Sequence, residues 1–276
     1  MDRLLSTCFT IALRFVIGWA CVEHLLLVRR QFRRRPVLRG NVVGRPYGVI
    51  AIVLLVESCL GVVVGWADNK LGSVANWLLW DSYVGVVFSL PVCVALVTSH
   101  FPRGPLLNYC VGFRTERGTR ARNQWWHLGV LFVAVLGASI ALSIVGKMRA
   151  GEYGRNLLKD LSGAPFYVLW LVVRAAIFEE LIFRGFLFPR LAKLLVRCAC
   201  ERRVALVIAA CVSSAVFAAG HAQLADPMWY KVGQAFFLGV VLCRVTYKFS
   251  IEVASVFHAL FNATVVLLAF WLDSAL

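Results

Sequence analysis

Charged residues are scarce in this chain, and their scarcity excludes most classes of soluble protein. Only 16% of the 276 residues are Asp, Glu, Lys or Arg, whereas 61% are hydrophobic. Soluble domains contain about 25% charged and about 45–50% apolar residues. Acidic residues are the scarcest, with 14 against 29 basic ones. We therefore expect the chain to reside in a lipid bilayer.

The sequence also lacks the features that mark cleaved, multidomain, repeated or disulfide-linked chains. The sequence shows no convincing cleavable signal peptide, no long linker and no low-complexity tract, so we expect one continuous membrane domain over residues 1–276. It has no inverted repeat of the kind from which many transporters are built. The nine cysteines are scattered, most of them in apolar segments where a thiol behaves as a small apolar group. We therefore predict neither a disulfide framework nor a zinc knuckle.

Long apolar runs are what the sequence has instead. A helix needs about 20 apolar residues to cross a hydrocarbon core about 30 Å thick, and about eight runs can do so. These runs lie near residues 4–28, 47–67, 77–98, 127–146, 166–188, 204–222, 230–246 and 251–272. They are continuously apolar, whereas barrel strands alternate. The predicted fold class is all-α, a polytopic transmembrane helical bundle of about eight spans.

The net charge of +15 reflects basic residues that gather in alternate connectors. The connectors after the first, third, fifth and seventh predicted spans hold most of them, beginning with the arginine-rich segment 29–45. An excess of Lys and Arg marks the cytoplasmic side of a membrane protein. We therefore expect cytoplasmic basic loops, both termini outside, and anionic lipid at the cytoplasmic face, with no nucleic-acid partner.

Three ionisable residues interrupt the predicted span 166–188. Glu179, Glu180 and Arg184 occupy two turns of a helix that should lie in the membrane, where each such group costs on the order of 3 kcal/mol. Glu180 and Arg184 are four residues apart, so they can pair on one helix face. Glu179 points about 100° away and has no partner in its own span.

Two later spans offer polar partners for Glu179. Phe217 and His221 are four residues apart at the end of one span, and His258 and Asn262 are four apart in another. Each pair therefore shares a helix face. A carboxylate, two imidazoles and a carboxamide that converge in a poorly solvated space can activate water and stabilise an oxyanion.

In this order and at these spacings, the three polar motifs closely resemble those of the CAAX protease and bacteriocin-processing family, also called the ABI family. This is a family of intramembrane glutamate proteases that includes the prenyl-protein endopeptidase of the endoplasmic reticulum. The resemblance covers about residues 165–270 and includes Gly185, the double serine before Phe217, and Gly239. It implies a catalytic core at 165–270, preceded by N-terminal transmembrane helices at 1–164.

The resemblance also implies a role for each polar residue. Glu179 would be the general base that, with His221, holds and activates the attacking water. His258 and Asn262 would stabilise the oxyanion of the tetrahedral intermediate. The supporting residues would pair helices, orient the site and form a wall of its pocket; they are Glu180, Arg184 and Phe217.

Metal dependence is open at this stage. Glutamate and histidine are ordinary zinc ligands, and many members of the family are labelled metalloproteases. The sequence contains no HExxH helix, and a glutamate with a histidine can activate water without a metal. We expect no cofactor; if zinc is present, its ligands would be Glu179, His221 and His258.

The sequence therefore predicts an intramembrane endopeptidase that acts on a membrane-associated peptide or lipidated protein. We expect it in the cell membrane of a prokaryote or the endoplasmic reticulum of a eukaryote. An alternative from a different class is a bacteriocin self-immunity or membrane scaffold protein that does not need proteolysis. A protein that only binds need not keep Glu179, His221, His258 and Asn262 together.

Overall fold

The fold is known from a computed structural model that describes residues 118–249 and 251–275, with scattered positions in 11–22 and 59–69. The predicted spans near 4–28 and 47–67 lie mostly outside the described residues, and the span near 77–98 lies wholly outside them. The segment that carries all three polar motifs is described throughout, apart from residue 250.

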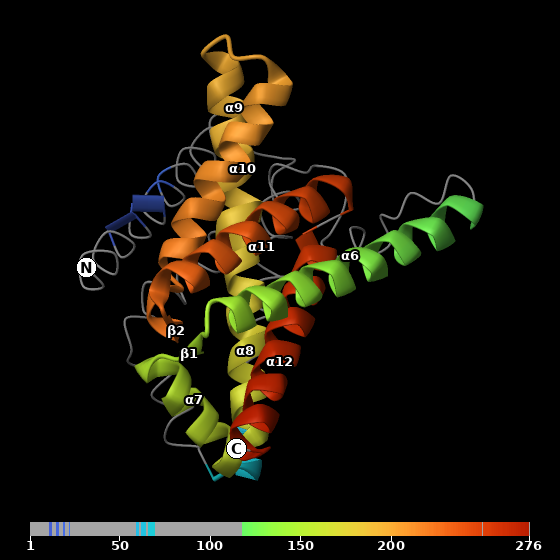
Figure 1. Ribbon diagram of the computed structural model, residues 1–276. Coiled ribbons are helices and arrows are strands. Elements are labelled where there is room, and N and C mark those ends of the chain that lie inside the picture. The colour runs from blue at the N-terminus through green and yellow to red at the C-terminus, as the bar shows by residue number, and fades with distance from the viewer. Residues whose placement is uncertain are drawn as a thin grey trace, which may run out of the picture.

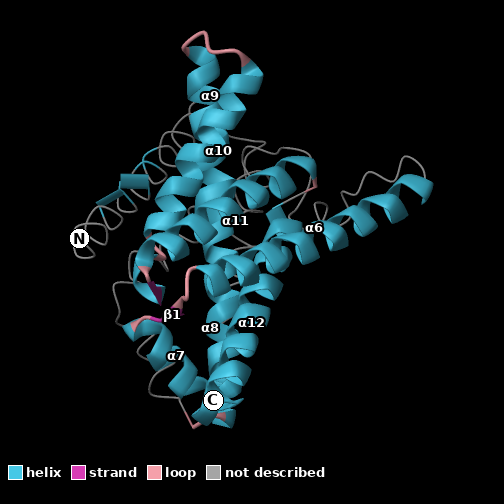
Figure 2. Ribbon diagram, viewed as in Figure 1, coloured by secondary structure: helices cyan, strands magenta, loops and turns pink. Residues whose placement is uncertain are grey.

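The described part of the chain is almost entirely helical (Figure 2). The helices in chain order are α6 Gly118–Val145, α7 Glu152–Gly163, α8 Pro165–Glu179, the π-helix η1 Glu180–Leu187, α9 Phe188–Arg197, α10 Arg202–Ala219, the 3-10 helix η2 Ala222–Leu224, α11 Met228–Lys248 and α12 Ile251–Ala275. Two short strands, β1 Arg149–Ala150 and β2 Ala225–Asp226, pair antiparallel and join the connector after α6 to the connector before α11.

Three of the described helices are long and apolar enough to cross a membrane. They occupy Trp125–Val145, Arg202–Leu224 and Val253–Trp271, and so match the predicted spans near 127–146, 204–222 and 251–272. The predicted spans near 166–188 and 230–246 are also helical, as α8 with η1 and as α11. The total of about eight spans remains a prediction.

The helices pack around a column formed by α8, η1 and α9, which follow one another without a break (Figure 1). The helix α12 packs along α8 and touches η1, while α10 packs against α9 and α11. The helix α6 packs against α11 and α12 and extends away from the rest of the bundle (Figure 1). This arrangement brings α10, α11 and α12 into contact with η1, the middle of the column.

The segment η1 is the most deeply buried part of the column. All of its residues except Gly185 are buried, and Ile182, Phe183 and Phe186 pack with Phe217 of α10 and Ala235 of α11. Apolar side chains exclude water from this position, so the charged residues of η1 lie in a dry environment.

The sequence predicts a helix here, and the structure differs in its geometry. The span from Pro165 continues through Glu180–Leu187 as a π-helix, and the N–H of Phe188 donates to the carbonyl of Phe183 five residues earlier. Pro189 follows directly and has no N–H to donate. Segments of π-helix are rare and occur frequently at functional sites, and this one begins between the two glutamates.

Candidate active site

The four residues predicted to do chemistry come together in the structure. Glu179 is the last residue of α8, His221 follows the C-terminal end of α10, and His258 and Asn262 lie one turn apart on α12. One carboxylate oxygen of Glu179 is 4.0 Å from Nε2 of His221, and the other is 3.7 Å from Nε2 of His258. Three separate helices therefore supply one polar cluster.

Glu180 and Arg184 form the predicted ion pair. Oε1 of Glu180 accepts a hydrogen bond from Nη1 of Arg184 at 2.8 Å, and both side chains are fully buried. The remaining polar atoms of the pair, which are Oε2 of Glu180 and Nε and Nη2 of Arg184, have no hydrogen-bond partner among the described residues. A single hydrogen bond thus joins the two side chains of this buried pair.

The structure links this pair to His258, which the helix spacing alone does not show. Nδ1 of His258 lies 2.9 Å from the same Glu180 oxygen that accepts from Arg184. The contact arises because α12 packs against η1 as well as against α8. A carboxylate accepts hydrogen bonds, so it places the imidazole hydrogen of His258 on Nδ1.

Asn262 completes the environment of His258. Its amide Nδ2 donates to Nε2 of His258 at 3.0 Å, so both ring nitrogens of this fully buried histidine have partners. The hydrogen bonds therefore form one continuous network from a buried cation to a partly buried amide, through Arg184, Glu180, His258 and Asn262. The amide has a second N–H group that His258 does not use.

Glu179 and His221 form the more accessible half of the cluster. Their side chains are 25% and 15% exposed, whereas those of Glu180 and His258 are completely buried. Nδ1 of His221 donates to the carbonyl of Phe217 at 2.9 Å, which leaves the neutral ring with an unprotonated Nε2 that faces Glu179. Oε2 of Glu179 has no hydrogen-bond partner among the described residues.

The apolar ring of Phe217 lies between the accessible and the buried half of the polar cluster. Its ring lies 4.4 Å from the His221 ring and 5.5 Å from the His258 ring, measured between centroids. The Arg184 guanidinium carbon is 4.3 Å from the Phe217 centroid, a distance typical of a cation–π contact. Phe217 therefore packs against both histidines and covers the buried cation.

Small residues allow the helices to approach around Arg184. A Cβ atom added to Gly239 of α11 would lie 2.8 Å from Cβ of Ser214 and 3.2 Å from Nη2 of Arg184. The neighbouring hydroxyl of Ser213 donates to the carbonyl of Phe183 at 2.9 Å and ties α10 to η1. The double serine and Gly239 therefore have packing roles in the structure.

The sequence interpretation missed one charged residue of the site. Lys231 of α11 interrupts the apolar run near 230–246, and its charge lies within electrostatic reach of Glu179 and His221. Its Nζ donates to Oε1 of Gln234 at 2.8 Å, and Gln234 donates to the carbonyl of Ser139 on α6 at 3.3 Å. A cation in an apolar run is the sequence signal that marks this position.

The three candidate zinc ligands are Glu179, His221 and His258, and each of the two histidines has a hydrogen-bond partner at Nδ1. Over the part of the chain that the structure describes, no three His, Cys, Asp or Glu side chains have the geometry to hold a metal ion. Among the three candidate ligands, His258 is already committed, because Nδ1 faces Glu180 and Nε2 accepts from Asn262. Metal-free chemistry at Glu179, His221 and His258 remains a prediction.

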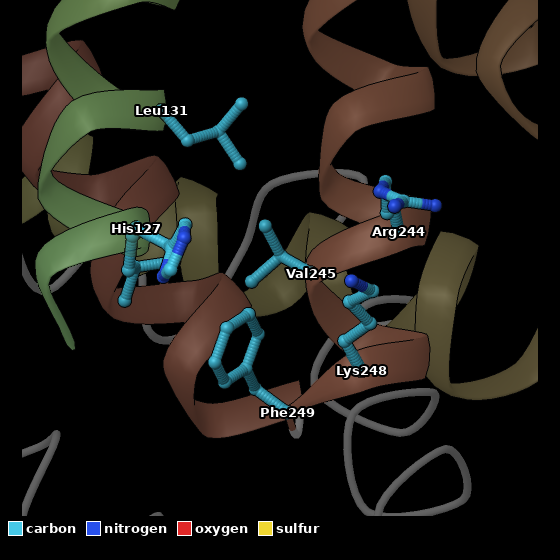
Figure 3. Close-up of a pocket in the computed structure, with 7 residues that line it drawn as sticks. His127, Leu131, Arg244, Val245, Lys248 and Phe249 are labelled. Carbon is cyan, nitrogen blue, oxygen red and sulfur yellow. The ribbon is translucent and has the colours of Figure 1, made fainter. Parts of the chain in front are cut away.

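A separate cavity lies between the start of α6 and the end of α11 (Figure 3). Its volume is about 530 Å³. It is lined by His127, Leu128, Leu131, Arg244, Val245, Lys248 and Phe249. None of these residues belongs to the polar cluster, so the cavity is a different feature of the molecule.

Comparison with known proteins identifies the segment that contains the cluster. Residues 161–264 match the family model described as type II CAAX prenyl endopeptidase Rce1-like. No curated protein and no solved structure matches the chain. The matched segment includes Glu179, His221, His258 and Asn262, and it confirms the resemblance to the CAAX protease family.

Proposed function

We propose that this chain, an integral membrane protein with a type II CAAX prenyl endopeptidase Rce1-like domain at residues 161–264, is an intramembrane endopeptidase whose Glu179 and His221 activate water. The observation that carries the proposal is the position of His221 relative to Glu179. An unprotonated imidazole nitrogen faces a carboxylate across 4.0 Å, too far for a hydrogen bond and suitable for one bridging water.

The chemistry follows from which atoms can accept a proton. A water between Nε2 of His221 and Oε1 of Glu179 donates a hydrogen bond to each, and Glu179 takes one proton as the water oxygen attacks the peptide carbonyl carbon. The carbonyl oxygen becomes an oxyanion in the tetrahedral intermediate. Glu179 then returns the proton to the leaving amine, and the carbon–nitrogen bond breaks.

We assign stabilisation of the oxyanion directly to Asn262. Its second amide N–H is available, while the first holds Nε2 of His258. His258 acts through Asn262 because its own hydrogen lies on Nδ1 and points to Glu180. The buried pair of Glu180 and Arg184 fixes His258, so the donor is already oriented before substrate binds.

The family points to a substrate class. The chain carries a type II CAAX prenyl endopeptidase Rce1-like domain, and we propose that it is a CAAX-type protease whose substrates are prenylated proteins or other membrane-associated peptides, cleaved in the cell membrane or endoplasmic reticulum. The orientation that we propose keeps the basic loops cytoplasmic and both termini outside, as the distribution of Lys and Arg predicts.

Anionic lipid is the second partner that we propose, and the cavity near the end of α11 fits it. Arg244 and Lys248 lie one turn apart on α11 and supply two cationic groups, while Leu131 and Val245 supply apolar side chains (Figure 3). A phospholipid headgroup with the start of its acyl chain has the matching chemistry.

Native mass spectrometry of protein released from phosphatidylserine and phosphatidylcholine nanodiscs tests this assignment. The variant with Arg244→Gln and Lys248→Gln should retain less phosphatidylserine than wild type. The control with Lys193→Gln and Arg197→Gln, both exposed on α9, should match wild type. Equal retention of phosphatidylserine by all three proteins would contradict the proposed lipid site.

A cleavage assay with purified full-length protein tests the proposed function. The probe is a synthetic peptide that ends in a farnesylated CAAX sequence, and the variants are Glu179→Gln and the exposed control Glu201→Gln. We expect Glu179→Gln to lower kcat about 10²-fold or more, as loss of a general base does, and Glu201→Gln to leave it unchanged. Equal cleavage by Glu179→Gln and wild type would sink the mechanism, whereas cleavage by neither would favour a scaffold or immunity role.

A further inference from the structure

Lys231 heads a row of small residues on the inward face of α11. Positions 231, 235, 239 and 243 follow at intervals of four and share one helix face. Ala235 packs with Phe183 and Phe217, and Gly239 lies against Ser214 and Arg184. Lys231 is thus on the side of α11 that faces the candidate site, one turn beyond Ala235.

The packing of α10 against α11 places Lys231 at the open end of the polar cluster. The two helices run in opposite directions, and Ser214 lies opposite Gly239 while Phe217 shares a cluster with Ala235. One further turn leads along α11 to Lys231 and, just past the end of α10, to His221. The charge interactions of Lys231 with His221 and with Glu179 agree with this register.

Within the part of the chain that the structure describes, the positive charge of Lys231 has no carboxylate in direct contact. Its hydrogen bond goes to the neutral amide of Gln234, and no described carboxylate forms an ion pair with it. Arg184 is different, because Glu180 contacts it at 2.8 Å. A charge in a membrane protein interior is costly unless a partner or a ligand uses it, and Lys231 is partly buried beside the accessible half of the site.

We propose that Lys231 binds the C-terminal carboxylate of the substrate and so makes the site specific for the end of a protein chain. This inference rests on the proposed function. A CAAX sequence ends the chain, so its α-carboxylate lies three residues beyond the modified cysteine. Three extended residues span up to about 10 Å, a length that suits a cation outside contact distance of Glu179 but still within its electrostatic reach.

The proposal gives Lys231 a role in specificity. A lysine ammonium is a compact point charge with three donors, and a terminal carboxylate is its natural ligand. Binding at Lys231 would draw the last residues of the substrate past Glu179 and His221. Internal peptide segments have no such carboxylate and would lose this contact.

Two peptides that differ in one group test the inference. Both end in the same farnesylated CAAX sequence, one as the free acid and the other as the C-terminal amide. We expect wild-type kcat/KM for the acid to exceed that for the amide by roughly tenfold or more, the size of a charge-assisted contact. In Lys231→Met this ratio should fall to about one, and Lys231→Arg should restore part of it.

Lys193→Met is the matched control, since Lys193 is an exposed lysine on α9. It should keep the wild-type ratio. A Lys231→Met protein that cleaves both peptides more slowly but keeps the ratio would reveal a structural role and overturn the inference. So would equal cleavage of acid and amide by wild type, with the proposed endopeptidase function left intact.

Failure of wild type to cleave either peptide would instead reject the proposed function, and the inference with it. The Lys231 variants could fail to fold, so a second measurement tests the role of Lys231 with wild-type protein alone. The tripeptide acid that corresponds to the last three residues should inhibit cleavage at least tenfold more strongly than its amide. Equal inhibition by acid and amide would overturn the role of Lys231.

Discussion

Gly239→Ala is the substitution whose effect the structure specifies most closely. The added methyl group would lie 2.8 Å from Cβ of Ser214, 2.9 Å from its Oγ and 3.2 Å from Nη2 of Arg184. Contacts this short force α11 away from α10 or displace Arg184. Overpacking of this kind costs about 1–3 kcal/mol, whereas alanine gains up to about 1 kcal/mol over glycine in a helix.

Gly233 on the same helix provides the control. A Cβ atom at Gly233 meets nothing within 4 Å, so Gly233→Ala should show only the gain in helix propensity. The two variants should differ in stability by about 1–3 kcal/mol, with Gly239→Ala the less stable. Their apparent melting temperatures in the same detergent or nanodisc provide the comparison.

A second-site change shows whether Ser214 is the obstacle. Ser214→Gly removes both atoms that the new methyl would strike first. In a double-mutant cycle, Ser214→Gly should therefore cost less in the Gly239→Ala background than in wild type, by about 0.5–3 kcal/mol. Additive effects, or a Gly239→Ala protein as stable as Gly233→Ala, would refute the packing that we describe around Arg184.

Three further predictions follow from the polar cluster. Arg184→Met should destabilise the protein by about 3–5 kcal/mol, because it leaves Glu180 buried without its partner; the double variant with Glu180→Gln should recover part of this loss in a thermal melt, and no recovery would contradict the pairing. Asn262→Ala should lower kcat by about 10²–10³-fold, as loss of an oxyanion donor does, with a smaller effect on KM; a change confined to KM would place Asn262 in substrate binding instead. Cleavage should survive exhaustive chelation, whereas loss of activity with rescue by zinc would assign Glu179, His221 and His258 as metal ligands.

The long apolar helices of the described region were predictable from the sequence because their apolar runs are continuous, whereas α7, Glu152–Gly163, lies between two predicted spans. The runs near 127–146, 204–222 and 251–272 correspond to helices that can cross a membrane. The convergence of Glu179, His221, His258 and Asn262 followed from spacings of four and from the family resemblance. The structure brings these residues within reach of one another.

Features that depend on packing between helices were not predictable in this way. The π-helix of Glu180–Leu187 has the same apolar pattern as an α-helix, so periodicity does not distinguish the two. The contact of Glu180 with His258 joins residues 78 positions apart. The place of Lys231 beside the site depends on the register between α10 and α11, which the sequence does not show.

The central claim is that Glu179 and His221 act on one water molecule. The direct measurement is kcat for Glu179→Gln, His221→Ala and the double variant on the farnesylated peptide. Groups that act as a unit are not additive, so the double variant should be no more than roughly tenfold slower than the slower single variant. Losses that multiply in the double variant would show that the two residues act independently and would contradict the account.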